Sequence, residues 1–335
     1  MTHAAIRTAH VSAPGKAMLL GEHAVVHARP CLVTAVDSRL YLTLAAGPPG
    51  GGTFTIHAPD VGVQGVAGRV ADALAGGEAR ARGTRFIESA LAVWRDRFGL
   101  ERDVTITTRS GFSSQLGLGS SSATVACALF ALAHVSGVSL STRDLFDLGL
   151  EAIFRVQQTG SGFDLAAAIS GGTLFYDNGQ PRQLVPLEVP HLPLVVAYSG
   201  VKADTPSVVR AVADRLAAWP AAMTGIFDTM ARIVHDGRAA LERADWPALG
   251  QLMDMQHGLA HAIGVDTPET ARLAFAARAA GAWGAKLSGA GGGDIVIALA
   301  PDERRAAIGA ALEAAGGTLV DVQPNAPGVR LEEQP

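Results

Sequence analysis

The chain has 335 residues, a formal net charge of −4 and a sequence pI near 6.2. Hydrophobic residues make up 48% of it and charged residues 17%, a balance that excludes a disordered chain and can supply a large core. The acidic balance gives no sign of the basic face that nucleic-acid binding requires, and the length favours two domains.

The two cysteines, Cys31 and Cys127, lie among apolar residues, so we expect buried free thiols and no disulfide. Without disulfides the sequence favours a reducing compartment, and we expect a cytoplasmic protein. The N-terminal residues lack the apolar region of a signal peptide. No run of about 18 apolar residues occurs, so no membrane span is expected.

The first half of the chain alternates patterns typical of strands and helices. In chain order the expected elements are strands at 39–44 and 53–57, helices at 66–82 and 88–98, a strand at 103–108, helices at 123–136 and 142–157, and a strand at 171–176. The stretch 177–193 is rich in Pro, Gly and Asn, and we place a domain junction near its end.

The second half is predicted to be mainly helical before it returns to strands. The expected elements are a strand at 194–198, helices within 206–261, a helix at 269–281, a strand at 295–299, a helix at 302–315 and a strand at 318–322. The final strand–helix–strand pattern predicts an α+β sandwich. The expected domains are therefore residues 1–190 and 191–335.

A run of glycine and serine separates a predicted strand from a predicted helix. It reads Gly117, Leu118, Gly119, Ser120, Ser121 and Ser122. Glycine allows close approach of the backbone to a ligand, and the N-terminus of a helix offers free N–H groups to phosphate. A plain loop that caps the helix explains this run equally well. It lacks the Lys of a Walker-type loop, and Ser122 stands where a dinucleotide fingerprint needs a third Gly.

Lys16, Glu22 and His23 are polar residues within an apolar run. Burial of three such groups is costly unless they are paired or bind a ligand. The alternative is a strand–turn–strand unit with Lys16 and Glu22 on a solvated edge.

Two later segments also carry candidate residues. Asp164 begins an apolar helical run, so it either caps that helix or faces a reacting hydroxyl as a base or orienting group. Four of the five residues at 289–293 are glycine, which suits close approach to a ligand or a tight turn between domains. His257 and His261 have the i, i+4 spacing of a metal site, but Gly258 replaces the expected Glu and we expect no metal there.

Taken together and in this order, the four segments resemble the GHMP kinases. The resemblance implies a two-domain α+β fold, with an N-terminal α/β domain of the ribosomal S5 domain 2 type and a C-terminal ferredoxin-like α/β sandwich. Within the superfamily, residues 21–27 and 256–265 look most like the mevalonate kinases. The implied activity is transfer of the γ-phosphate of ATP to the 5-hydroxyl of mevalonate in isoprenoid precursor synthesis, and the implied assembly is a homodimer.

The resemblance also implies roles for single residues. Lys16 and Asp164 would be catalytic, and Ser121 would bind Mg²⁺. The residues implied to hold ATP are Gly117, Leu118, Gly119, Ser120, Ser121, Ser122, Gly289, Ala290, Gly291 and Gly292. Those implied to face the acceptor are Glu22, His23, Gly162 and Thr205.

Some positions depart from the mevalonate kinase pattern. Gly160 stands where those kinases usually have Pro, and Gly160 and Asp294 look closer to the phosphomevalonate kinases. Mevalonate kinases also carry a magnesium-binding Glu upstream of the catalytic Asp. In this chain Ile153 lies near that position, and the nearest carboxylate is Glu151, two residues further upstream than expected.

Three alternatives to a mevalonate kinase stay open: a phosphomevalonate kinase, a non-catalytic nucleotide-binding relative, and a decarboxylase of the same superfamily. A phosphorylated acceptor would need extra cations, and the sequence offers few candidates near the acceptor: Lys16, Arg39, Lys202 and Arg155.

Overall fold

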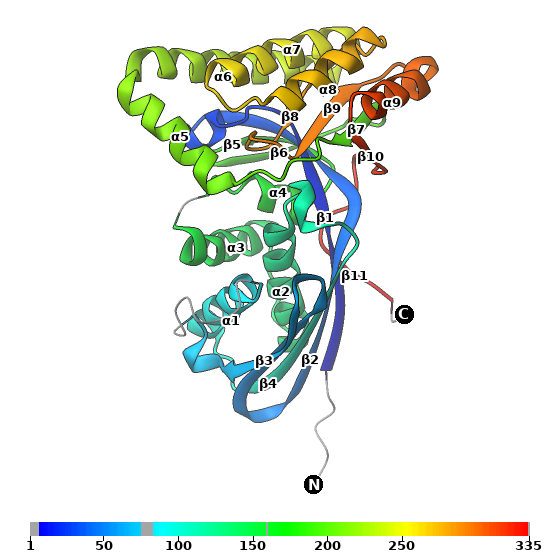
Figure 1. The fold of residues 1–335 in the computed structure, drawn as a ribbon. Coiled ribbons are helices and arrows are strands. Elements are labelled where there is room, and N and C mark those ends of the chain that lie inside the picture. Colours follow the sequence, from blue (N-terminus) through cyan, green and yellow to red (C-terminus); the bar gives the residue numbers. More distant parts are fainter. Residues whose placement is uncertain (1–6, 75–82, 159, 334–335) are drawn as a thin grey trace.

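The computed structural model describes residues 7–74, 83–158 and 160–333. Its strands form two sheets (Figure 1). The first sheet contains β1 (Arg7–Leu20), β2 (Pro30–Ala58), β3 (Val63–Arg69), β4 (Arg102–Ser110), β5 (Thr173–Asp177), β6 (Gln183–Leu187) and β11 (Arg330–Leu331). The second contains β7 (Leu194–Tyr198), β8 (Gly284–Ser288), β9 (Ile295–Leu299) and β10 (Thr318–Val320).

Helices pack against each sheet and divide between the two units in chain order (Figure 1). The first unit has α1 (Arg85–Phe98), α2 (Ser120–Ser136), α3 (Thr142–Gln157) and α4 (Phe163–Ser170). The second has α5 (Thr205–Ala218), α6 (Pro220–Glu242), α7 (Trp246–Ala262), α8 (Pro268–Ala279) and α9 (Arg305–Ala314). Two sheets with separate sets of helices confirm the predicted α+β class.

The long pair β1 and β2 forms the frame of the first unit. Their register runs from Arg7 opposite Ala46 to Leu20 opposite Leu32. The second half of β1 is buried at every position, because α2 and α4 pack on one of its faces and elements of the second unit contact its far end. Since α2 is apolar around nearly its whole circumference, it lies between the sheet and helices α1 and α3.

The structure corrects two predictions in this region. The helix expected at 66–82 is wrong over its first part, because Val63–Arg69 is a strand paired with the edge of β2 and only Val70–Asp72 forms a helical turn. Backbone pairing to an available edge outweighs the helical propensity of a short Ala-rich run; the remainder, 75–82, lies outside the described residues. The residues expected to form two strands, 39–44 and 53–57, both lie in the single strand β2, whose register with β4 shifts between Ala46 and His57.

The last described residues return to the first sheet. β11 pairs with β1 through Val11 opposite Leu331, and Val36 forms a bridge with Pro324. The predicted boundary places this tail in the second domain, whereas its hydrogen bonds lie in the first unit. Arg39 holds the tail, because its buried guanidinium donates to Pro327 O at 2.6 Å and Gly328 O at 2.8 Å.

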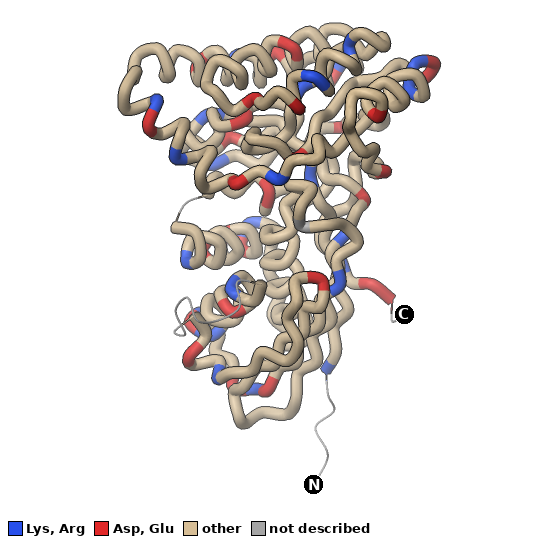
Figure 2. Tube along the Cα trace, in the orientation of Figure 1, with Lys and Arg blue, Asp and Glu red and all other residues tan. Residues whose placement is uncertain are grey.

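Both charge signs are scattered along both units (Figure 2). The thiols Cys31 and Cys127 are buried and free, as predicted. Among the helices that the structure describes, none has the length and apolar character needed to cross a membrane.

The contribution of Arg39 to anchoring the C-terminal tail can be measured as a change in the free energy of unfolding. We expect Arg39→Met to lower the free energy of unfolding by roughly 2–4 kcal/mol, because it removes the buried guanidinium that donates to two carbonyls of the tail. Urea unfolding followed by circular dichroism measures the change. Arg143→Met is the control: its exposed pair with Asp147 on α3 is expected to contribute less than about 1 kcal/mol. Equal losses in the two variants would contradict the anchoring role.

Candidate active site

The two units meet around the C-terminal half of β1 (Figure 1). Lys16 on this strand donates its backbone N–H to Leu118 O at 3.0 Å and its Nζ to Gly117 O at 2.9 Å. These bonds join β1 to residues 117–122, here called the serine loop. A Cβ added at Gly289 would lie 3.9 Å from Lys16 Nζ, so the glycine loop (residues 289–293) of the second unit reaches the same side chain.

Lys16 and Asp164 face each other at this junction. Lys16 Nζ lies 3.5 Å from Asp164 Oδ1, and the lysine side chain is 5% exposed whereas the aspartate side chain is 35% exposed. Asp164 Oδ1 itself is buried and accepts no hydrogen bond. A buried acceptor oxygen without a donor is uncommon in folded proteins. Here it lies beside a cation at the start of α4, where a hydroxyl group of a substrate could supply the missing donor.

The serine loop brings the start of α2 to the same place. Gly117 and Gly119 have φ of 69° and 83°, values that favour glycine. No side chain caps α2, so the first N–H groups of the helix stay available to a ligand. A Cβ at Gly119 would lie 3.3 Å from Lys16 Cγ, which shows how closely the loop and the lysine pack. Helix dipole and ammonium group both favour an anion here.

A cavity of about 580 Å³ opens beside the start of α2. Its walls come from segments far apart in the sequence: the β2–β3 connection, α1, the end of β4 and the serine loop. Sequence reasoning missed these walls except for Ser120 and Ser121, because the lining is assembled from segments that lie far apart in the chain. The remaining polar and aromatic members of the lining include Asp60, Phe86, Thr108, Ser110, Phe112, Ser113, Gln115 and Thr124.

A fully buried ion pair connects the two units behind the site. Glu22, just after β1, accepts a hydrogen bond from Lys286 Nζ of β8, and both side chains are 0% exposed. Burial raises the pKa of Glu22 and lowers that of Lys286, and in each case the partner opposes the shift. Ser288 Oγ completes the junction, because it accepts from Met18 N at 2.9 Å and donates to Met18 O at 3.0 Å.

His23 makes a further contact between the units. Its Nε2 lies 2.7 Å from Ala290 O of the glycine loop, so this nitrogen carries the proton and donates it. Burial lowers the pKa of His23 and favours the neutral ring. Glu22 and His23 therefore both lie at the junction with the second unit.

Comparison with known proteins identifies the architecture. The family models for the N-terminal domain and the C-terminal domain of GHMP kinases match residues 85–172 and 238–317. Two proteins named mevalonate kinase, from Thermococcus onnurineus and Pyrococcus horikoshii, are 32% and 33% identical to this chain; each alignment covers 96% of this chain, and 98% and 97% of the relatives. This chain belongs to the GHMP kinase family.

A solved structure with bound ligand agrees with this assignment. The crystal structure of L. major mevalonate kinase in complex with R-mevalonate has a TM-score of 0.76 to this GHMP kinase, at 27% sequence identity, and the match covers 96% of this chain and 98% of that one. A Lin0012 protein from Listeria innocua has the same fold, with a TM-score of 0.86 at 20% identity, over 98% and 100% of the two chains.

Three further predicted site residues of this GHMP kinase, Gly162, Thr205 and Glu151, lie at or on helices α4, α5 and α3. Gly162 precedes α4 with φ of 87° and Thr205 is the exposed first residue of α5. Glu151 is exposed on α3, where its Oε1 accepts from Arg155 Nη2 at 2.5 Å. Its carboxylate is thus engaged by a cation on the same helix.

Three predicted acceptor-side cations are already engaged. The prediction that Arg39 lies near the acceptor is wrong, because its side chain is buried under the C-terminal tail. Lys202 Nζ pairs with Asp294 Oδ1 at 3.0 Å, and Arg155 pairs with Asp96 at 2.7 Å. Lys16 is left as the cation of that set beside Asp164.

Magnesium fits this site as a metal held mainly by a nucleotide. The described residues contain no group of three or more His, Cys, Asp or Glu side chains placed to hold a metal ion. Mg²⁺ commonly takes one or two protein oxygens and completes its shell with phosphate and water. Ser121 on the cavity wall and the partly exposed carboxylate of Asp164 offer hard oxygens of this kind.

The buried pair gives a testable consequence for the junction. We expect Lys286→Met to lower the free energy of unfolding by roughly 3–5 kcal/mol at pH 8, because it leaves the Glu22 carboxylate buried without its cation. The loss should be smaller at pH 5, since a carboxyl with a raised pKa takes up a proton as the pH falls and becomes neutral.

The double variant Glu22→Met, Lys286→Met is the control, since it removes both charges and should recover most of the stability. Urea unfolding at the two pH values measures all three proteins. A double variant no more stable than the single one would show that the ion pair is not the source of the loss.

Proposed function

We propose that this GHMP kinase transfers the γ-phosphate of ATP to the 5-hydroxyl of mevalonate. The observation that carries the proposal is the buried Asp164 Oδ1, which accepts no hydrogen bond and lies 3.5 Å from Lys16 Nζ beside the serine loop. The names of the sequence relatives, and the R-mevalonate bound to the L. major neighbour, support mevalonate as the acceptor.

The position of the cavity suggests how ATP lies. The free N–H groups at the start of α2 and the backbone of the serine loop suit its phosphates, and the adjoining cavity of about 580 Å³ has room for the nucleoside. Mg²⁺, when bound, would neutralise part of the phosphate charge, and Ser121 is the candidate ligand on the protein.

Phosphoryl transfer requires mainly orientation and charge stabilisation from the protein. Asp164 Oδ1 would accept the hydrogen bond of the mevalonate hydroxyl and then its proton. Lys16 would favour the deprotonated oxygen and stabilise negative charge on the transferred group. Its bond to Gly117 O keeps the ammonium group between the serine loop and Asp164.

Phosphomevalonate is a weaker candidate acceptor. A second phosphate on the acceptor would need further cations, and Arg39, Lys202 and Arg155 are each bound to other groups of the protein. Gly160 and Asp294 resemble the phosphomevalonate kinases, and Asp294 binds Lys202 and lies against Gly117. The expected homodimer and cytoplasmic location stay predictions.

The acceptor can be determined directly. We expect ADP release in the presence of Mg-ATP with mevalonate and not with 5-phosphomevalonate, measured side by side in a coupled assay. Turnover with phosphomevalonate alone would replace the proposed acceptor. No turnover with either compound would direct the search to other small alcohols, beginning with homoserine and sugars.

Substitutions test the two catalytic roles. We expect Asp164→Asn and Lys16→Met each to lower kcat about 10²- to 10⁴-fold, because one removes the proton acceptor and the other removes the cation. Steady-state kinetics with mevalonate measure both effects, and thermal unfolding checks that the proteins fold. Asp236→Asn, on the exposed side of α6, should keep the kcat of the parent protein. Near-normal kcat in a folded Asp164→Asn protein would remove Asp164 from the mechanism.

A further inference from the structure

The turn between α7 and α8 lies directly against the glycine loop. Val265 O accepts a hydrogen bond from Gly292 N at 2.7 Å. A Cβ added at Gly291 would lie 2.4 Å from the same carbonyl oxygen, so this contact leaves no room for a side chain. The position of Val265 therefore determines where the glycine loop can run.

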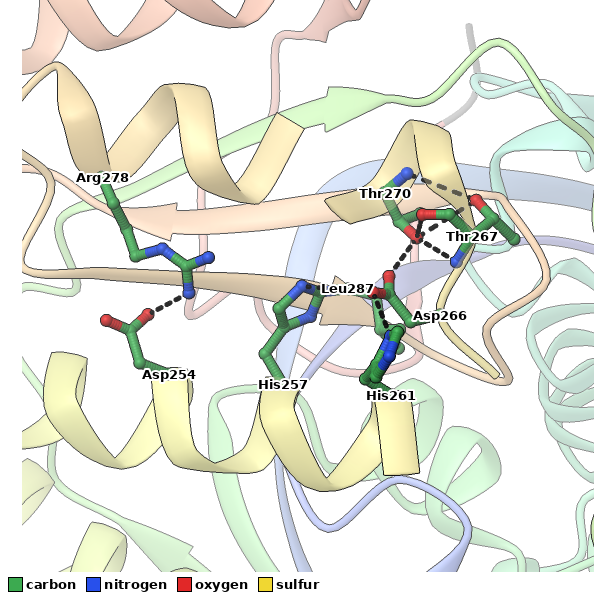
Figure 3. Close-up of polar contacts among 8 residues, drawn as sticks. All are labelled: Asp254, His257, His261, Asp266, Thr267, Thr270, Arg278 and Leu287. Carbon is green, nitrogen blue, oxygen red and sulfur yellow. Dashed lines mark hydrogen bonds and ion pairs between the residues drawn. The ribbon is translucent and has the colours of Figure 1, made fainter. Parts of the chain in front are cut away.

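His257 of α7 connects this turn to β8, the strand from which the glycine loop emerges (Figure 3). Its Nδ1 accepts a hydrogen bond from Leu287 N at 3.4 Å. On the opposite side of the ring, Nε2 lies 3.7 Å from Oδ2 of Asp266, the residue after Val265, and both side chains are buried. The second carboxylate oxygen of Asp266 accepts from Thr270 Oγ1 at 2.6 Å, which fixes the carboxylate at the start of α8.

These contacts require one protonation state of the ring. Nδ1 must be free of a proton to accept the Leu287 N–H, so the proton lies on Nε2 and faces the Asp266 carboxylate. Burial lowers the pKa of His257 below the usual histidine range, although Asp266 acts in the opposite direction. The ring is therefore neutral at pH 7, as the bond to Leu287 demands.

We propose that His257 is a positioning residue that holds the glycine loop in the form competent for ATP, and that protonation of His257 at acid pH releases it. A proton on Nδ1 would point at the Leu287 N–H, so two donors would face each other and the bond would be lost. The consequence for ATP rests on the proposed function, because the glycine loop is expected to close the nucleotide cleft. The contacts themselves do not depend on it.

The other charges around the ring come from three elements, and Figure 3 shows those on α7 and α8. On α7, Asp254 Oδ1 pairs with Arg278 Nη1 of α8 at 3.0 Å, so these two charges largely cancel. Lys286 on β8 acts against protonation of the ring. His261, one turn after His257, places its Nδ1 3.4 Å from Asp266 Oδ2, but its side chain is 79% exposed. Both histidines thus lie near the Asp266 carboxylate, but only His257 is buried. His261 therefore serves as an exposed control for substitutions of His257.

The test compares three substitutions in the full-length protein. His257→Leu removes the acceptor, His257→Asn keeps a side-chain oxygen that can accept from Leu287 N without titrating, and His261→Asn is the surface control. Calorimetry gives Kd for Mg-ATP at pH 7.5 and 5.5, and deuterium exchange reports on a peptide that covers the glycine loop. Because ATP itself gains protons in this range, proteins are compared with one another at the same pH.

We expect His257→Leu to weaken ATP binding roughly 3- to 10-fold at pH 7.5, the equivalent of one hydrogen bond, and to speed exchange in the glycine loop. His257→Asn should match the parent protein at pH 7.5 and bind ATP more tightly than the parent at pH 5.5. His261→Asn should follow the parent at both pH values.

Two results would overturn the proposal: a folded His257→Leu protein with the affinity and loop exchange of the parent, or a His257→Asn protein that loses affinity at pH 5.5 as the parent does. If His257→Leu does not fold, the proposal is decided by the Kd values of the parent and of His257→Asn for Mg-ATP at the two pH values. If the parent binds no ATP at either pH, the proposed function fails, whereas exchange in the glycine loop still decides the positioning role.

Discussion

The buried pair of Glu22 and Lys286 joins the two units at the place where the candidate active site forms. Glu22 follows β1 and Lys286 lies on β8, and neither side chain has contact with solvent. Removal of either charge would leave the other buried and unpaired, which is strongly unfavourable. The pair therefore fixes the end of β1 against β8. Lys16 lies on one of these strands and the glycine loop begins directly after the other, so their relative position depends on this contact.

In the proposed mechanism, anion binding and the groups that act on the acceptor come from different segments of the chain. Backbone N–H groups at the start of α2 can bind phosphate, and the cation arrives from a different strand, since Lys16 donates to Gly117 O. This arrangement lets one ammonium group contact both the serine loop and Asp164. The Asp164 carboxylate is partly exposed, while its Oδ1, which accepts no hydrogen bond, is buried beside the lysine.

The backbone conformation and close packing of the glycine loop explain why four of its five residues are glycine. Gly289, Gly291, Gly292 and Gly293 all have positive φ, and added side chains at the last three would meet the backbone or side chains of Val265, Val208 and Val201. The loop is tied at both ends as well, by His23 to Ala290 O and by Asp294 N to Val201 O. The glycine loop is thus held in one conformation by neighbours from the turn after β1, the α7–α8 turn, the segment before α5 and α5 itself.

The sequence by itself determined the α+β class, most of the helices and the four segments that build the site. Periodicity is a local property, and polar residues such as Lys16 and Asp164 within apolar runs are visible without coordinates. The tertiary structure alone decided which partners those residues meet. It paired Glu22 with Lys286, placed Arg39 under the C-terminal tail, and turned part of the predicted helix at 66–82 into an edge strand. Each of these outcomes depends on contacts between residues far apart in the chain, and neither local propensity nor spacing carries that information.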